Sequence, residues 1–265
     1  MGRRLSCRRL PTSVFFSSSL NHDGKNGGKR RECGIFFVIL RSDTENYFNM
    51  KKLEHLLAEK LLNISAIKLQ PDMPFTWASG WNSPIYTDNR KTLSYPEIRT
   101  FIKTELCRLI MENFERPDAV AGVATGAIAQ GALVADNMGL PYVYVRSAPK
   151  DHGLENLIEG NLSLGQKVIV IEDLVSTGKS SLKAAEAIRQ SGAEVIGMVA
   201  MFTYGFPQAD EAFKEAGIKL MTLSNYNALL EAALRTGFIA DKDVETLRQW
   251  RQDPANWVPD IKKQD

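Results

Sequence analysis

Short apolar runs alternate with helical stretches along most of the chain after residue 50. Runs rich in β-branched residues predict strands at 119–123, 141–145, 167–171, 194–202 and 218–223. Amphipathic or small-residue stretches predict helices at 51–62, 96–113, 127–137, 180–190, 207–216, 225–235 and 241–252. Strands and helices that alternate at these lengths predict an α/β fold with a mainly parallel central sheet flanked by helices.

The turns that follow the predicted strands are the places to look for a ligand site. Ligands of parallel sheets bind beyond the carboxyl ends of the strands, which here means the turns after residues 123, 145, 171 and 203. The polar stretch 146–163 contains few core-forming side chains and predicts a long loop. Ahead of the sheet, Gly80 and the pair Ser83-Pro84 are turn signals between short strands.

The first 49 residues differ from the rest of the chain. They hold nine basic and four acidic residues, show little periodicity, and contain no apolar stretch near the roughly 20 residues that a membrane-spanning helix needs. Met50 is followed at once by an amphipathic helix, as expected at the start of a folded domain. We expect residues 1–49 to be a disordered or non-native leader and residues 50–265 to form the domain. A targeting segment is the alternative, because residues 1–20 contain Arg and Ser but no acid.

Composition excludes several classes of protein. Hydrophobic residues make up 44% and charged residues 24%, which is typical of a globular chain. Three cysteines and three histidines, none at zinc-ligand spacing, exclude a disulfide scaffold and leave little material for a metal centre. The total of 33 basic and 31 acidic residues leaves 24 and 27 after the leader, so bulk charge gives no case for nucleic-acid binding.

The strongest chemical signal is the segment 168–181. An apolar strand ends in two adjacent carboxylates, Glu172 and Asp173, and is followed by a turn with small hydroxyl residues and Gly178 before a helix begins. A helix start with free N–H groups binds phosphate, whereas carboxylates accept hydrogen bonds from sugar hydroxyls. Together they predict a site for a ribose 5-phosphate.

Two other interpretations fit this segment less well. A Walker A loop would need a glycine five positions before Gly178, and that position is Asp173. An ordinary helix cap by Ser176 or Thr177 would explain the hydroxyls, but not two carboxylates at the end of a buried strand.

The segment resembles the 5-phosphoribosyl 1-diphosphate (PRPP) signature of type I phosphoribosyltransferases. The resemblance implies the type I fold, with a small N-terminal hood at about residues 50–95. It implies that Glu172 and Asp173 hold the ribose hydroxyls. It also implies that the 5-phosphate is held by the residues that follow, namely Leu174, Val175, Ser176, Thr177, Gly178, Lys179 and Ser180.

Two further segments resemble the orotate phosphoribosyltransferase family. Residues 75–90 are similar to its hood, which implies backbone contacts to orotate. Arg90 is a candidate partner for the orotate carboxylate, because a guanidinium matches a carboxylate, and we expect Arg90 and Ser176 to contact orotate. Residues 146–153 are similar to its mobile catalytic loop, which implies that Arg146, Lys150 and His152 bind PRPP and stabilise the leaving pyrophosphate. The resemblance further implies Mg²⁺ carried by PRPP near Asp173, and a homodimer that shares loop 146–160.

Three positions depart from the pattern of some family members. Ala78 and Ser147 stand where those members have Lys, and the strand after the signature helix runs Phe202-Thr-Tyr-Gly205 without an orotate-binding Arg. We interpret these as features of a second branch of the family. The sequence predicts a cytoplasmic enzyme that makes orotidine 5-monophosphate, with no nucleic-acid or membrane partner. The alternatives are a non-catalytic PRPP sensor and a purine phosphoribosyltransferase.

Overall fold

The computed structural model describes residues 50–77, 80–148 and 157–259. They all belong to one compact unit that spans Glu45–Asp265. The predicted leader, residues 1–49, lies outside the described residues. None of the described helices is both long enough and apolar enough to cross a membrane.

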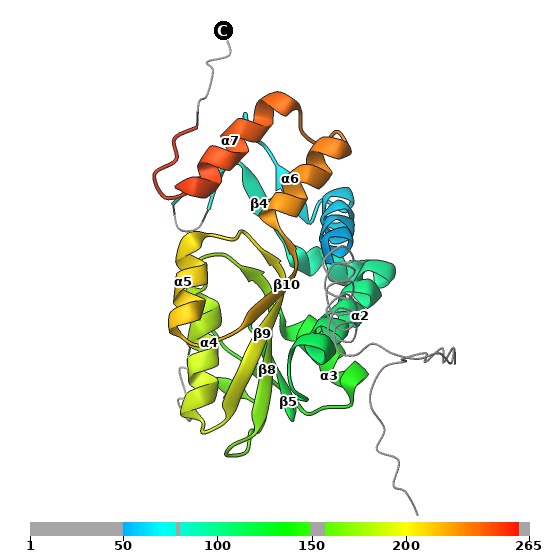
Figure 1. Cartoon of the computed structure of the whole chain (residues 1–265), viewed down its shortest axis with the longest axis vertical. Helices are drawn as coiled ribbons and strands as arrows, with labels where there is room; N and C mark the ends of the chain where they lie inside the picture. The colour runs from blue at the N-terminus through cyan, green and yellow to red at the C-terminus, as the bar shows by residue number, and fades with distance from the viewer. Residues whose placement is uncertain (1–49, 78–79, 149–156, 260–265) are drawn as a thin grey trace, which may run out of the picture. The chain divides into compact units, whose positions relative to one another are not determined.

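A six-stranded sheet forms the centre of this unit (Figure 1). In spatial order its strands are β10 (Leu220–Asn225), β9 (Glu194–Thr203), β8 (Lys167–Val175), β5 (Ala119–Val123), β6 (Tyr142–Val145) and β7 (Ile158–Glu159). All neighbours pair in parallel except β7, which is antiparallel to β6. The carboxyl ends of five strands therefore meet at one edge of the sheet, which confirms the predicted parallel α/β fold.

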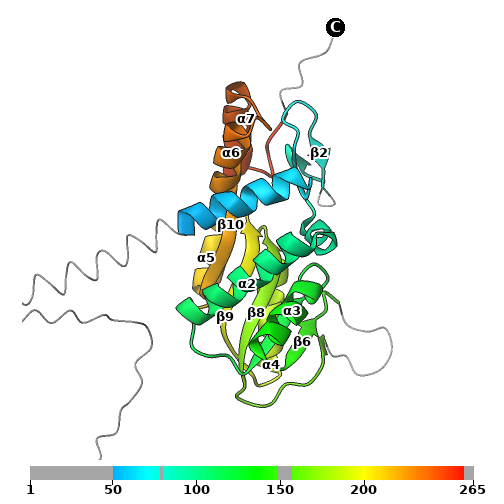
Figure 2. The ribbon, with the colours of Figure 1, turned by 90° about the vertical axis from the view of Figure 1, so that its right-hand side faces the viewer.

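Helices cover both faces of the sheet (Figures 1 and 2). Helices α2 (Pro96–Asn113) and α3 (Ile128–Met138) pack on one face, and α4 (Lys179–Gln190) and α5 (Pro207–Glu215) pack on the other. Alternate strand residues serve the two faces: Ile169 and Ile171 of β8 join the first core cluster, whereas Val168 and Val170 join the second. A strand that is buried on both faces reads as one continuous apolar run, as the sequence of β8 does.

A smaller set of elements lies beyond the carboxyl ends of the strands, and we call it the hood (Figure 2). It contains a helix at residues 50–63, two short antiparallel pairs and a 3₁₀ helix, η1 (Asn89–Ser94). The pairs are β1 (Ile67–Leu69) with β4 (Ile85–Thr87), and β2 (Phe75–Thr76) with β3 (Asn82–Ser83). The C-terminal helices α6 (Tyr226–Arg235) and α7 (Asp241–Gln252) complete it. Trp250 of α7 is fully buried among aromatic rings there.

The sequence misplaced three elements. Strand β8 continues to Val175, four residues beyond the predicted end at 171, because Leu174 and Val175 still pair with Phe202 and Thr203 of β9. Strand β7 lies inside the predicted loop 146–163, where two residues are held by pairing with the edge strand β6. The 3₁₀ helix η1 was not predicted, since its residues carry no helical apolar pattern.

Candidate active site

The two adjacent acids lie near the carboxyl end of strand β8 and differ in their surroundings. Glu172 is only 4% exposed, and its carboxylate accepts hydrogen bonds from Ser181 Oγ at 2.7 Å and from the Asp173 amide at 2.9 Å. Asp173 is half-buried, with its carboxylate against the turn after β5, where a Cβ on Gly126 would overlap it. Asp173 is therefore the more accessible of the two acids, and Glu172 braces the start of α4. The contact of Glu172 with a ribose hydroxyl stays a prediction.

Burial sets the electrostatics of this pair. It raises the pKa of Glu172, and the neighbouring Asp173 carboxylate raises that pKa further. Burial also raises the pKa of Asp173, although hydrogen bonds and the charge of Arg90 oppose the change. Keeping two partly buried carboxylates ionised side by side costs free energy. A ligand that brings hydroxyl donors or a cation to Asp173 would lower this cost.

The turn after β8 leads directly into helix α4. Ser176 and Thr177 are half-buried, and Gly178 is the N-cap residue with a φ of 81°, a left-handed conformation that favours glycine. No side chain caps α4 among the residues described there, which argues against the helix-cap interpretation. The N–H groups of its first turn thus stay open to an anion. Lys179 and Ser180 are exposed at the start of the helix.

Leu174 and Val175 lie in the strand and not in the turn. Val175 is fully buried, and its carbonyl oxygen accepts hydrogen bonds from the Tyr204 amide at 3.1 Å and from Thr203 Oγ1 at 3.2 Å. Leu174 is half-buried and packs on the core. These two residues join the predicted phosphate turn to the end of β9, so their side chains act as part of the scaffold.

The hood reaches the acid pair through residues 88–90. Asn89 is 2% exposed, and its Nδ2 donates to the Asp173 carbonyl oxygen at 2.6 Å, whereas its Oδ1 is buried without a hydrogen-bond partner. Arg90 is exposed and donates from Nε to Asp88 Oδ1 at 2.7 Å. That hydrogen bond raises the pKa of Arg90, and the charge of Asp173 adds to the effect. The structure thus brings Arg90 near Asp173, and its contact with orotate stays a prediction.

Asn89 is a residue that sequence reasoning missed. The available signal was its place between two charged residues, directly after a short strand, but an isolated Asn in such a segment usually faces solvent. Asn89 is buried because η1 packs against α2 and against β8, and β8 is far from η1 in the sequence.

The predicted cationic loop begins at the end of β6, two strands away from β8 in the sheet. The Arg146 amide donates to the Leu157 carbonyl oxygen at 2.8 Å, and its Nη1 lies 3.7 Å from Glu159 Oε1. Lys183 of α4 donates to the Ser147 carbonyl oxygen at 3.1 Å, which ties the start of this loop to the helix that follows the acid pair. Lys150 and His152 lie outside the described residues.

Comparison with known proteins now decides the family. A model of the phosphoribosyl transferase domain matches residues 97–227. Over 208 residues the chain is 69% identical to an orotate phosphoribosyltransferase of Bacteroides thetaiotaomicron, a match that covers 78% of this chain and 98% of the relative. The chain belongs to the orotate phosphoribosyltransferase family.

Solved structures agree with this assignment. An orotate phosphoribosyltransferase of Aeropyrum pernix has a TM-score of 0.61 and 28% identity, and the match covers 69% of this chain and 99% of that one. The Mycobacterium tuberculosis orotate phosphoribosyltransferase in complex with PRPP has a TM-score of 0.53 and 25% identity, with coverages of 69% and 99%. The predicted type I fold and the predicted family are thereby confirmed.

The described residues offer a magnesium ion few ligands of their own. They contain no group of three or more His, Cys, Asp or Glu side chains that could hold a metal by themselves. Asp173 can offer carboxylate oxygen, the ligand type that Mg²⁺ prefers. The site thus fits an ion that is held mainly by a bound phosphate ester and touched by one protein carboxylate.

Proposed function

We propose that this chain is an orotate phosphoribosyltransferase, a pentosyltransferase of pyrimidine biosynthesis. It would convert orotate and PRPP into orotidine 5-monophosphate and pyrophosphate. The observation that carries the proposal is one continuous arrangement, in which a partly buried Asp173 at a strand end adjoins an uncapped helix start and the hood. The 69% identity to a protein of that name supports it.

The proposed reaction exchanges one bond at the anomeric carbon. The bond to the pyrophosphate oxygen breaks and its electron pair leaves with pyrophosphate, while N1 of orotate, which has released its proton to solvent, forms the new bond to carbon. Asp173 accepts hydrogen bonds from the ribose hydroxyls, and Glu172 keeps the Asp173 amide and Ser181 in place. The 5-phosphate accepts hydrogen bonds from the N–H groups at the start of α4. The enzyme accelerates the reaction by orienting the two substrates and neutralising the charge of the leaving group, and no covalent nucleophile is needed.

The cationic loop is proposed to act on the leaving group. Arg146, Lys150 and His152 would neutralise the negative charge that builds on pyrophosphate as the bond breaks. Arg146 directly follows strand β6, whose carboxyl end lies at the same edge of the sheet as Asp173. Mg²⁺ would be held by PRPP oxygens beside Asp173, where it would add positive charge next to the same leaving group.

The base is proposed to lie between the hood and the phosphate turn. Arg90 would contact the orotate carboxylate, and Ser176 would reach the pyrimidine from the turn side. A homodimer that shares loop 146–160 and a cytoplasmic location are also part of this proposal, and both rest on the family.

One assay tests the proposal. Purified full-length chain is mixed with PRPP, Mg²⁺ and orotate, and the loss of orotate absorbance is followed, with uracil and hypoxanthine as control acceptors. We expect turnover with orotate alone. Turnover with hypoxanthine would favour the purine enzyme, and PRPP binding without any turnover would favour the PRPP sensor.

A further inference from the structure

Arg251, in the last turn of α7, binds the backbone at the end of β9. Its Nε donates to the Tyr204 carbonyl oxygen at 2.9 Å and its Nη2 to the Gly205 carbonyl oxygen at 2.8 Å. Its Nη1 donates to Asn227 Oδ1 at 2.9 Å. All three guanidinium nitrogens thus have a partner, and one side chain joins α7, α6 and the β9–α5 turn.

The surroundings of Arg251 are built around this contact. Gly205 has a φ of 63°, which strains any other residue, and a Cβ there would lie 2.9 Å from Arg251 Nη2, so a larger residue would displace the guanidinium. The guanidinium carbon lies 5.9 Å from the centre of the Tyr226 ring. The three acceptors are neutral groups, so the contact depends on geometry rather than on an ion pair.

The turn that Arg251 holds touches both sides of the site. The Tyr204 amide donates to the Val175 carbonyl oxygen at 3.1 Å, directly before the phosphate turn. The Tyr204 hydroxyl donates to Thr87 Oγ1 at 3.0 Å, directly before the segment 88–90 that meets Asp173. Tyr204 is 2% exposed, so neither contact competes with bulk water. Tyr204 therefore links the hood to strand β8, beside the direct hydrogen bond from Asn89 to Asp173.

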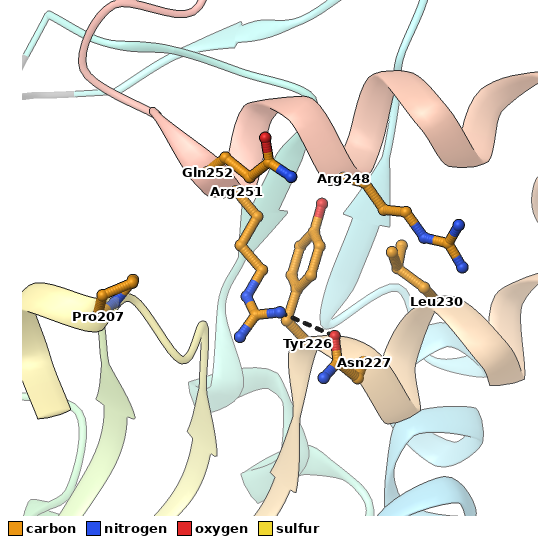
Figure 3. Close-up of a pocket in the computed structure, with 7 residues that line it drawn as sticks. All are labelled: Pro207, Tyr226, Asn227, Leu230, Arg248, Arg251 and Gln252. Atoms are coloured by element: carbon orange, nitrogen blue, oxygen red, sulfur yellow. Dashed lines mark hydrogen bonds between the residues drawn. The ribbon is translucent and has the colours of Figure 1, made fainter.

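The neighbouring cavity does not explain Arg251 as a ligand-binding group. The cavity has a volume of about 340 Å³ and is lined by Pro207, Tyr226, Asn227, Leu230, Arg248, Arg251 and Gln252. Figure 3 shows Arg248 extending away from Arg251, with Tyr226 and Leu230 between them. The two guanidiniums therefore do not converge on one anion, and the contacts of Arg251 are made within the protein.

We propose that Arg251 is a positioning residue for the base side of the active site. It fixes the Tyr204–Gly205 turn, and Tyr204 in turn fixes the hood segment 87–90 relative to Asp173. The inference rests on the proposed function, because it assigns the hood to orotate. It places a determinant of orotate affinity in the C-terminal helix, outside the segments that carry the family motifs.

Four variants of the full-length chain test this role. Arg251→Ala should raise the KM for orotate about tenfold, since two hydrogen bonds from a charged donor are lost. The KM for PRPP should change by less than about twofold, since the phosphate turn keeps its own contacts. Arg251→Lys should give an intermediate KM for orotate, because an ammonium cannot bridge two carbonyls as a planar fork does. Tyr204→Phe keeps the buried ring, loses the hydrogen bond to Thr87, and should raise this KM about fivefold. Arg248→Ala, on the same helix and beside the same cavity, is the control and should match the wild type.

The outcomes separate a positioning role from a purely structural one. A lower melting temperature with an orotate KM within about twofold of wild type in both Arg251→Ala and Tyr204→Phe would overturn the inference. So would an equal effect of Arg248→Ala. If Arg251→Ala does not fold, Arg251→Lys and Tyr204→Phe decide by the same criterion. A wild-type chain that does not turn over orotate overturns the proposed function and this inference together, whereas an active wild type with unaffected variants overturns the inference alone.

Discussion

The two sides of the site are built in different ways. The ribose-phosphate side is one strand, turn and helix, residues 172–181, in which every group is a near neighbour along the chain. The base side is assembled from the hood segment 87–90, the turn at 204–205 and Arg251 of α7. A local motif can be recognised from a sequence, whereas an assembled wall exists only once the fold has formed.

The two sides also differ in how far they are satisfied without a ligand. On the ribose-phosphate side, burial raises the pKa of both acids, and the start of α4 has no side-chain cap. On the base side, the rings of Trp77, Tyr204 and Trp250 pack on one another at centroid distances of 5.4–5.7 Å, and the polar groups of Arg251 are paired. The first side holds unfavourable electrostatics that a substrate can relieve, and the second supplies a rigid frame.

The largest effect should come from removing the charge of Asp173. Asp173→Asn keeps the shape but loses a charged acceptor for ribose hydroxyls, so kcat/KM for PRPP should fall about 100-fold. Asp136→Asn, an exposed acid on α3, is the matched control. Steady-state kinetics at saturating orotate measure the effect. Normal PRPP kinetics in Asp173→Asn would remove the ribose role and, with it, the distinction between the two sides.

This contrast also explains how much could be predicted from the sequence. The parallel sheet and the acid–hydroxyl–glycine turn were predicted because apolar runs and a contiguous motif carry them. Asn89, Gly126 and Arg251 were not, because each matters only through a partner 46 or more residues away: Asp173 for the first two, and Tyr204 with Gly205 for the third. The separation of the partners along the sequence, and not the type of residue, thus limited which site residues could be predicted. The assignments of Lys150 and His152 stay predictions.

A smaller effect is expected where the two sides meet. Asn89→Ala removes the hydrogen bond to the Asp173 carbonyl oxygen, so both the acid and the hood segment lose their shared anchor. The KM values for PRPP and orotate should rise together, by about fivefold to tenfold. Asn113→Ala, which loses a side-chain bond inside α2, is the control and should leave both unchanged. A rise for one substrate only would show that Asn89 belongs to one side and does not join them.

Arg90→Ala should act on the base side alone. Its guanidinium is exposed and already shares one hydrogen bond with Asp88, so its contribution to binding is moderated by solvent. We expect the KM for orotate to rise about fivefold with little change in the KM for PRPP. Arg116→Ala, another exposed arginine, serves as the control. Equal changes for both substrates would remove Arg90 from the orotate site.

The smallest effect should appear in stability as a function of pH. The pKa of Glu172 is higher in the folded state than in the unfolded state, so the folded protein binds the proton more tightly. The protonated Glu172 therefore stabilises the fold fully at a pH below its pKa in the unfolded state. This stabilisation is lost as the pH rises through its pKa in the folded state. Glu172→Gln cannot lose a proton there and can still accept from the Asp173 amide. The melting temperature of each ligand-free protein is measured at about pH 5 and about pH 9. Between these two pH values it should fall by about 2–4 °C less in the variant than in the wild type. Glu194→Gln, at the exposed start of β9, is the matched control and should follow the wild type. Parallel melting curves for Glu172→Gln and the wild type would show that the ribose-phosphate side is no more strained than the frame that faces it.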